Sequence, residues 1–81
     1  MRCRVKLFAR ARDLAGADEV SVSLPDGATV ADLRRALASA YPALTGLLAR
    51  SALAVANEFA DDAQPVPPEA EVALLPPVSG G

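Results

Sequence analysis

Charged and apolar side chains alternate strictly near the start of the chain, and this pattern limits the folds open to it. Across Arg2–Leu7 every second residue is apolar, and each residue between is a cation. Residues two apart share one face of an extended strand, so this segment has one face for a core and one for water. Other elements must cover the apolar face, which predicts a layered sheet domain. The 81 residues allow one small domain of this kind.

A second strand and a turn follow. Glu19–Leu24 repeats the alternation, after a connection that is too long for a tight hairpin and in which Arg10–Ala15 can form a helical turn. Pro25-Asp26-Gly27 then predicts a change of direction, because proline presets φ and glycine accepts a positive φ.

The next segment has the start signal and the spacing of a helix. Thr29 is followed three residues later by Asp32, which resembles a capping box. Apolar residues then recur at helical spacing until Pro42 marks the end. We expect this helix to bury its apolar side on the sheet and to point Arg34 and Arg35 to solvent.

The rest of the domain supplies the remaining strands. Residues 44–48 predict a short helical turn, and Leu53–Phe59 predicts a third strand. Pro65–Pro68 allows only a short edge segment, because proline donates no hydrogen bond to a ladder. Val72–Leu75 is apolar without alternation, so we expect it in the centre of the sheet beside the first strand, with Leu75 on the far face.

The order of these elements is strand, strand, helix, strand, short strand, strand. One main helix must then cover one face of a mixed sheet. This order predicts an α+β fold of the β-grasp, or ubiquitin-like, type. We expect the β-grasp domain to span residues 1–75 and residues 76–81 to form an extended C-terminal tail.

Several kinds of chemistry need residues that this sequence lacks. It has no histidine, so a Ser-His-Asp arrangement and the commonest general base are excluded. Its isolated glycines and its single lysine, Lys6, form no phosphate-binding loop. The single cysteine, Cys3, falls on the inward side of its strand, without a second cysteine or a histidine to share a metal. We expect a core thiol, no metal site, and a chain that is not an enzyme by itself.

Charge and hydropathy limit the partners and the location. The net charge is −2, yet five of the eight basic residues lie in the first twelve positions and none follows Arg50. This split is explained either by first and last strands that neutralise each other or by a charged partner face. Nucleic acid is not expected, because the chain is acidic and its basic stretch lacks aromatics. No apolar run approaches the ~20 residues that span a bilayer, and one cysteine fits the cytoplasm.

The end of the sequence has the composition of an extended tail. Pro76 and Pro77 stop the last strand and favour a polyproline-like exit from the domain. Gly80 and Gly81 carry no Cβ, so the tail can thread a narrow channel and bring its carboxyl carbon to a buried site. A frayed terminus is the alternative that this composition leaves open.

Three segments together match a known family. They are Phe8–Gly16, the helix entry Ala28–Leu33 and, most specifically, the ending Pro-Pro-Val-Ser-Gly-Gly. In order and over essentially the whole chain, they resemble the small-subunit family of molybdopterin synthase, a group of β-grasp sulfur carriers. The sequence departs from the family pattern where Glu69-Ala70 replaces Gly-Asp and where Leu75 replaces a frequent phenylalanine.

The resemblance implies a function for the tail. A ubiquitin-activating-type enzyme would use ATP to adenylate Gly81, and a sulfur donor would convert the product into a thiocarboxylate. The tail, which includes Val78, Ser79 and Gly80, would then enter the large subunit of the synthase, where the active site lies. Sulfur would pass to the cyclic pterin precursor and build the molybdopterin dithiolene.

The resemblance also implies the partners. Phe8, Arg12 and Leu75 are the residues expected to contact the large subunit, in an assembly of two small and two large subunits. The chain would bind no cofactor itself, since ATP and the sulfur donor are used by the activating enzyme. Other functions stay open: a sulfur carrier for thiamine, cysteine or tRNA thiolation, or a non-catalytic β-grasp binding module with a frayed tail.

Overall fold

The computed structural model describes residues 1–75, so the predictions for the tail (Pro76, Pro77, Val78, Ser79, Gly80 and Gly81) lie outside the described residues. The elements, in chain order, are β1 Arg2–Leu7, α1 Ala9–Ala15, β2 Glu19–Ser23, α2 Val30–Ala40, the 3₁₀ helix η1 Pro42–Leu44, α3 Thr45–Leu48, β3 Ala52–Val55, β4 Glu58–Phe59 and β5 Val72–Leu75.

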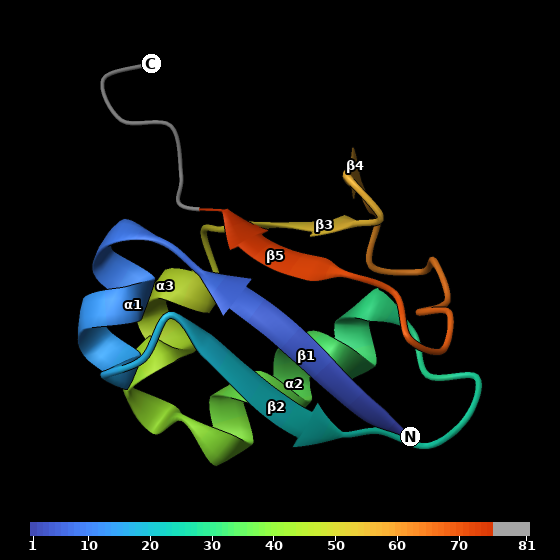
Figure 1. The fold of residues 1–81 in the computed structure, drawn as a ribbon, viewed down its shortest axis with the longest axis horizontal. Helices are drawn as coiled ribbons and strands as arrows, with labels where there is room; N and C mark the ends of the chain where they lie inside the picture. Colours follow the sequence, from blue (N-terminus) through green and yellow to red (C-terminus); the bar gives the residue numbers. More distant parts are fainter. Residues whose placement is uncertain (76–81) are drawn as a thin grey trace.

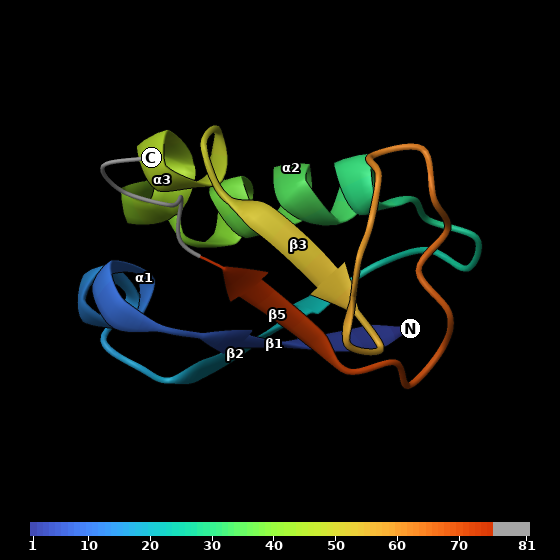
Figure 2. The same cartoon turned by 90° about the horizontal axis from the view of Figure 1, so that it is seen from above.

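The five strands form one mixed sheet in the order β2-β1-β5-β3-β4 (Figure 1). β5 runs parallel to β1 and antiparallel to β3, and the outer strands β2 and β4 pair antiparallel with their neighbours. The last strand therefore lies in the centre beside the first, which confirms the prediction from its apolar run. α2 and α3 lie on one side of the sheet (Figure 2). Within residues 1–75 the other side has no helical layer, and we call it the open face.

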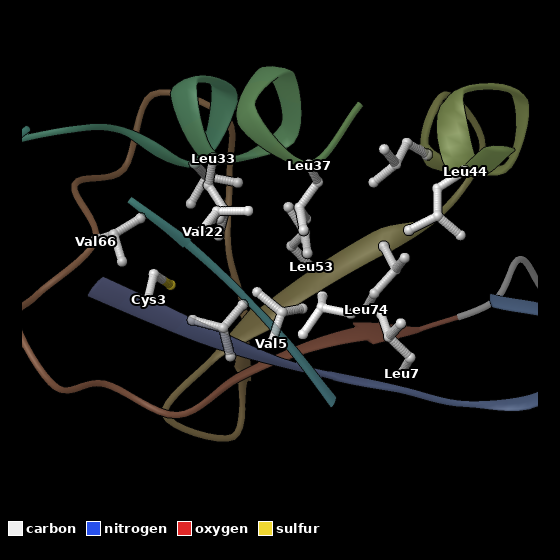
Figure 3. Packing of buried hydrophobic residues seen from close by; sticks show 14 of the residues in the cluster. Cys3, Val5, Leu7, Val22, Leu33, Leu37, Leu44, Leu53, Val66 and Leu74 are labelled. Atoms are coloured by element: carbon white, nitrogen blue, oxygen red, sulfur yellow. The ribbon is translucent and has the colours of Figure 1, made fainter. Parts of the chain in front are cut away.

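The core lies between the sheet and α2 (Figure 3). The inward residues of β1, Cys3, Val5 and Leu7, are at most 5% exposed, and Leu33 and Leu37 of α2 are fully buried against them. Burial raises the pKa of the Cys3 thiol above its ordinary value. The cysteine is thus a protonated core residue at neutral pH, as its place in the alternation predicts.

α2 begins at the predicted capping box. The main-chain N–H of Asp32 donates to Thr29 Oγ1 over 3.3 Å, and the N–H of Thr29 donates to Asp32 Oδ2 over 2.9 Å. This second bond, together with a bond from the Arg35 guanidinium, holds the pKa of Asp32 below its ordinary value. An aspartate closes the box here in place of the usual glutamate or glutamine.

Arg34 does not point to solvent, and the sequence prediction for it is wrong. Its guanidinium donates to the carbonyl oxygens of Leu48 and Ser51 and, over 3.2 Å, to Asp62 Oδ1. Only 24% of its side chain is exposed. The carbonyls at the end of α3 have no donor within the helix, and this arginine supplies one. Helical spacing correctly placed Arg34 outside the buried apolar residues of α2. It could not show that the short helix α3 packs beside α2 there.

We expect Arg34→Ala to lower the free energy of unfolding by about 2 kcal/mol. It removes the guanidinium donor of the Ser51 carbonyl and leaves the Leu48 carbonyl with only the 3.4 Å bond from the N–H of Ser51. Arg35→Ala is the matched control, since Arg35 is 74% exposed and its ion pair with Asp32 contributes less than about 1 kcal/mol. Urea unfolding of the two variants measures both quantities. Equal, small losses would contradict the structural role given to Arg34.

The segment 53–59 is a hairpin, although the sequence predicts a single strand. Ala56 and Asn57, with φ of 52° and 68°, separate β3 from β4. Two consecutive residues at positive φ make the tight turn that joins antiparallel strands. The short strand of the predicted order is therefore β4.

The proline-rich segment supplies no strand of the sheet, which corrects the expectation of an edge strand there. Pro65 makes only an isolated bridge to Thr29. The segment instead contributes to the core through Val66, which is 3% exposed and whose N–H donates to the carbonyl of Ala28 over 2.8 Å. Proline's missing donor explains why pairing stops after one bridge.

Candidate functional site

An apolar strip crosses the open face over β3, β4 and β5. In β5 every second residue is buried under the helical layer, and the residues between face the open side. The ladders place Ala73 beside Ala54, and Leu75 beside Ala52. Ala54 in turn pairs with Phe59 of β4. The apolar strip consists of Ala52, Ala54, Phe59, Ala73 and Leu75.

Phe59 is the most exposed large apolar side chain of the described residues, at 76%. A continuous strand from 53 to 59 would turn it toward the core together with Leu53 and Val55. The two-residue turn reverses the chain, so Phe59 shares the open face with Ala54. Asn57, which tolerates a left-handed conformation, was the one signal in the sequence for this turn.

The predicted contact residues Phe8 and Arg12 line one hollow of about 400 Å³ at the junction of β1 and α1. Asp18 and Glu19, where β2 begins, also line it, so the hollow lies on the side of β1 away from β5 and the apolar strip. Ala9 has a positive φ of 51°, which turns the chain out of β1 and into the helix. Ala11 is buried and fixes α1 on the core, so Phe8 is left 44% exposed, with Arg12 one helical turn after it.

Leu75 lies at the same end of the sheet. β1 and β5 are paired up to Leu7 and Leu74, and Phe8 and Leu75 are the next residues of each strand. Leu75 is half-buried on the open face, as predicted for its far-face position. The structure therefore brings Phe8 and Leu75 to one end of the sheet, with Arg12 one helical turn after Phe8. Phe59 lies away from that end, on the edge strand β4 and level with Ala73.

An ion pair between neighbouring strands explains part of the uneven distribution of charge along the sequence. Lys6 of β1 and Glu71, just before β5, form an ion pair of 3.2 Å. This pair fits the prediction that the first and last strands neutralise each other. Both side chains are more than half exposed, so the pair contributes little to stability.

Two kinds of site are absent from residues 1–75. No three His, Cys, Asp or Glu side chains gather there in a way that could hold a metal ion. None of the helices in this part of the chain is long and apolar enough to cross a membrane. The chemical groups on the open face can bind and orient a partner, but they provide no nucleophile with an adjacent base.

A mixed sheet in this strand order, with one main helix across one face, defines a ubiquitin-like β-grasp protein. The chain belongs to the ThiS family, whose model matches residues 5–81.

Individual relatives narrow the comparison. The molybdopterin synthase sulfur carrier subunit of Chlamydomonas reinhardtii is 35% identical over all of both chains. The crystal structure of SAMP1 (small archaeal modifier protein 1) from Haloferax volcanii has a TM-score of 0.87 and 32% identity, with all of both chains covered. A putative molybdopterin converting factor subunit 1 from Pyrococcus furiosus has a TM-score of 0.85 and 29% identity, over 96% of this chain and 99% of that one.

Proposed function

We propose that this protein is the sulfur carrier subunit of a molybdopterin synthase and that Gly81 carries the sulfur. The observation that supports this most is full-length similarity to a subunit of that name, at 35% identity. The matching family model extends through Gly81. The Pro-Pro-Val-Ser-Gly-Gly ending follows directly from β5, the central strand of the sheet.

The proposed chemistry begins with an unreactive group. A terminal carboxylate has a pKa near ~3.5 and is an anion at neutral pH, so it must be activated. Its oxygen attacks the α-phosphorus of ATP on an adenylating enzyme, which forms the acyl-adenylate and releases pyrophosphate. A sulfide-level sulfur donor then attacks the acyl carbon, AMP leaves, and Gly81 becomes a thiocarboxylate.

The thiocarboxylate is the group that delivers sulfur. It is ionised at neutral pH, and its soft sulfur can act as a nucleophile without a histidine on this chain. Its sulfur attacks a carbon of the cyclic pterin precursor, and the carbon–oxygen bond at that carbon breaks and releases its oxygen group. Water then cleaves the acyl–sulfur bond, which leaves the sulfur on the pterin and restores the Gly81 carboxylate. The large subunit supplies the acid, base and orienting groups for this step, since the small subunit has no histidine of its own.

The large subunit is the proposed occupant of the apolar strip and of the adjoining Phe8 and Arg12. Exposed phenylalanine and arginine side chains are enriched at interfaces, and the half-buried Leu75 adds apolar area beside them. We propose a heterotetramer of two small and two large subunits in the cytoplasm, where a lone cysteine stays reduced.

Leu75→Asp is expected to weaken binding to the large subunit by about 2 kcal/mol, because it places an unpaired charge in a desolvated patch. Leu14→Asp is the matched control. Leu14 is 37% exposed on α1, and it lies two residues, or about 200° of helix rotation, from Arg12. Calorimetric titration measures the affinities, and thermal melting checks that both variants fold. Equal affinities of Leu75→Asp and Leu14→Asp would place Leu75 outside the interface.

Two measurements test the proposed function: which protein copurifies with this chain, and which product the pair forms. The protein, tagged and expressed in its own cells, should copurify with a molybdopterin synthase large subunit, and the thiocarboxylated protein mixed with that subunit should convert the pterin precursor. Copurification with a thiamine, cysteine or tRNA-thiolation enzyme instead would assign it to one of those pathways.

The similarity to SAMP1 supports a second candidate function, that of a protein modifier. Here the acyl-adenylate of Gly81 would be attacked by a lysine amine of a target, which forms an amide and releases AMP. Denaturing gels of cells that express the tagged protein separate the two candidates. A modifier gives a ladder of conjugates that resists thiols, whereas a dedicated sulfur carrier gives a single band.

A further inference from the structure

A second hollow lies on the charged half of the open face. It has a volume of about 420 Å³ and runs along β1, between β2 and the loop that precedes β5. The outward residues Arg2, Arg4 and Lys6 form its floor. Residues two apart on one strand face are about 6.6 Å apart, so the three cations make a regular row.

The cations of this row are not neutralised to the same degree. Lys6 is paired with Glu71 over 3.2 Å and sits opposite Glu19 in the ladder with β2. Arg4, by contrast, sits opposite Ser21, and Arg2 sits opposite Ser23. Within residues 1–75 neither arginine forms an ion pair, and Arg2 makes only a long bond of 3.4 Å to Ser23 Oγ.

These four residues form a strip of hydrogen-bond donors on the open face. We call Arg2, Arg4, Ser21 and Ser23 the arginine strip. Guanidinium groups bind carboxylates through two parallel hydrogen bonds, and a neighbouring hydroxyl can donate a third. The strip is therefore suited to a carboxylate.

The opposite wall of the hollow limits the kind of anion that fits. Glu69 lines it and adopts a positive φ of 61°, an uncommon conformation for a residue with a side chain. Glu71 lies two residues further on, and Glu19 borders the hollow on the β2 side. These carboxylates repel a polyanion such as nucleic acid, whose charges repeat along its length, more strongly than they repel a single acidic side chain.

The arginine strip is close enough to the apolar strip for one partner to cover both. Arg4 precedes Phe8 by four residues, or about 13 Å of extended chain. A standard interface buries about 800 Å² on each partner, which is a patch about 30 Å across. An interface centred on Leu75 and Ala73 therefore extends over Arg4.

We propose that the arginine strip is a second docking site, which receives an acidic side chain of the large subunit that covers the apolar strip. The proposal rests on the proposed function, since it takes the synthase large subunit as the partner. The apolar strip supplies desolvation and slows dissociation. The arginine strip supplies charge complementarity, which accelerates association and fixes the orientation of the carrier.

The test is the association rate constant of the carrier with its cognate large subunit, measured by stopped flow. Arg4→Glu should lower this constant about tenfold near 0.1 M salt, where the Debye length is about 10 Å. The difference should nearly vanish at 1 M salt, where that length is about 3 Å. Arg4→Gln should give an intermediate value, and melting curves should show that both variants fold.

Arg50→Glu is the matched control, because it makes the same charge change at an exposed residue that follows α3, in the helical layer. It should associate like the parent protein. Equal rates for Arg4→Glu and Arg50→Glu would overturn the second docking site. A parent protein that binds no large subunit would instead overturn the proposed function. A labelled single-stranded RNA that binds the parent and not Arg4→Glu, with subunit association unchanged, would make the strip a nucleic-acid site and also overturn the proposal.

Discussion

A chain that lacks Gly81 is expected to transfer no sulfur while its fold stays unchanged. The proposed chemistry takes place at the carboxyl carbon of Gly81, which follows the last strand, β5, by six residues. Deletion leaves a carboxyl group on Gly80, one residue and about 3.5 Å short of its place. A misplacement of about 1 Å already costs on the order of a hundredfold in rate, so this larger one should abolish transfer.

The control for this deletion is a chain that keeps every residue but gains one alanine after Gly81. It moves the carboxyl group about 3.5 Å in the other direction and should be equally inactive. Single-turnover assays with the activating enzyme and the large subunit measure transfer, and thermal melting measures the fold. Sulfur transfer by either chain at the parent rate would contradict the assignment of the reacting group to Gly81.

Gly80→Ala is expected to slow sulfur transfer by about a hundredfold without a change in stability. Gly80 bears no reacting atom, but the added methyl group must either clash with a narrow channel or shift the backbone that carries Gly81. Alanine also adopts a positive φ far less readily than glycine. Transfer is measured in a single turnover from preformed thiocarboxylate, which separates this step from activation.

Ser79→Ala serves as the comparison for Gly80→Ala, because it removes an atom from the same tail and adds none. It should transfer sulfur within a few-fold of the parent. A parent-like rate for Gly80→Ala would refute the narrow channel and leave Gly80 as a spacer.

The fold was predictable from local patterns that have one structural solution. The alternation of Arg2–Leu7 defines an inward and an outward face, and the unbroken apolar run of Val72–Leu75 requires a central strand. The capping box at Thr29 and Asp32 fixes the start of α2. Each of these signals depends on residues that are close together in the sequence, so each can be recognised without knowing which distant segments pack together.

The errors arose where a contact between distant segments decides the structure. Arg34 has the helical position of a surface residue, but its partners Leu48, Ser51 and Asp62 are 14 to 28 residues away. In a single continuous strand, the alternation of faces would place Phe59 on the core side. The turn at Ala56 and Asn57 reverses the chain and places it on the open face. Neither fact follows from periodicity, because periodicity does not report which segments pack together.

The candidate site was only partly predictable from the residues themselves. The apolar run placed Leu75 on the far face, but Phe8 has the pattern of an ordinary apolar residue, and the ladder between β1 and β5 is what brings the two to one end of the sheet. Phe59 and the arginine strip became visible only when register and exposure were known. The composition of the ending predicts a tail that can enter a narrow channel, and only the resemblance implies the chemistry at Gly81.

Intact mass spectrometry tests most directly whether Gly81 exchanges one carboxylate oxygen for sulfur. The protein is incubated with an adenylating enzyme, ATP and a sulfur source, and the product is fragmented to locate the change. We expect the mass of the protein to rise by the difference between sulfur and oxygen. The gain should be confined to Gly81 and should depend on ATP. An unchanged mass, with an enzyme that forms the acyl-adenylate of this chain in the same experiment, would contradict the proposed exchange.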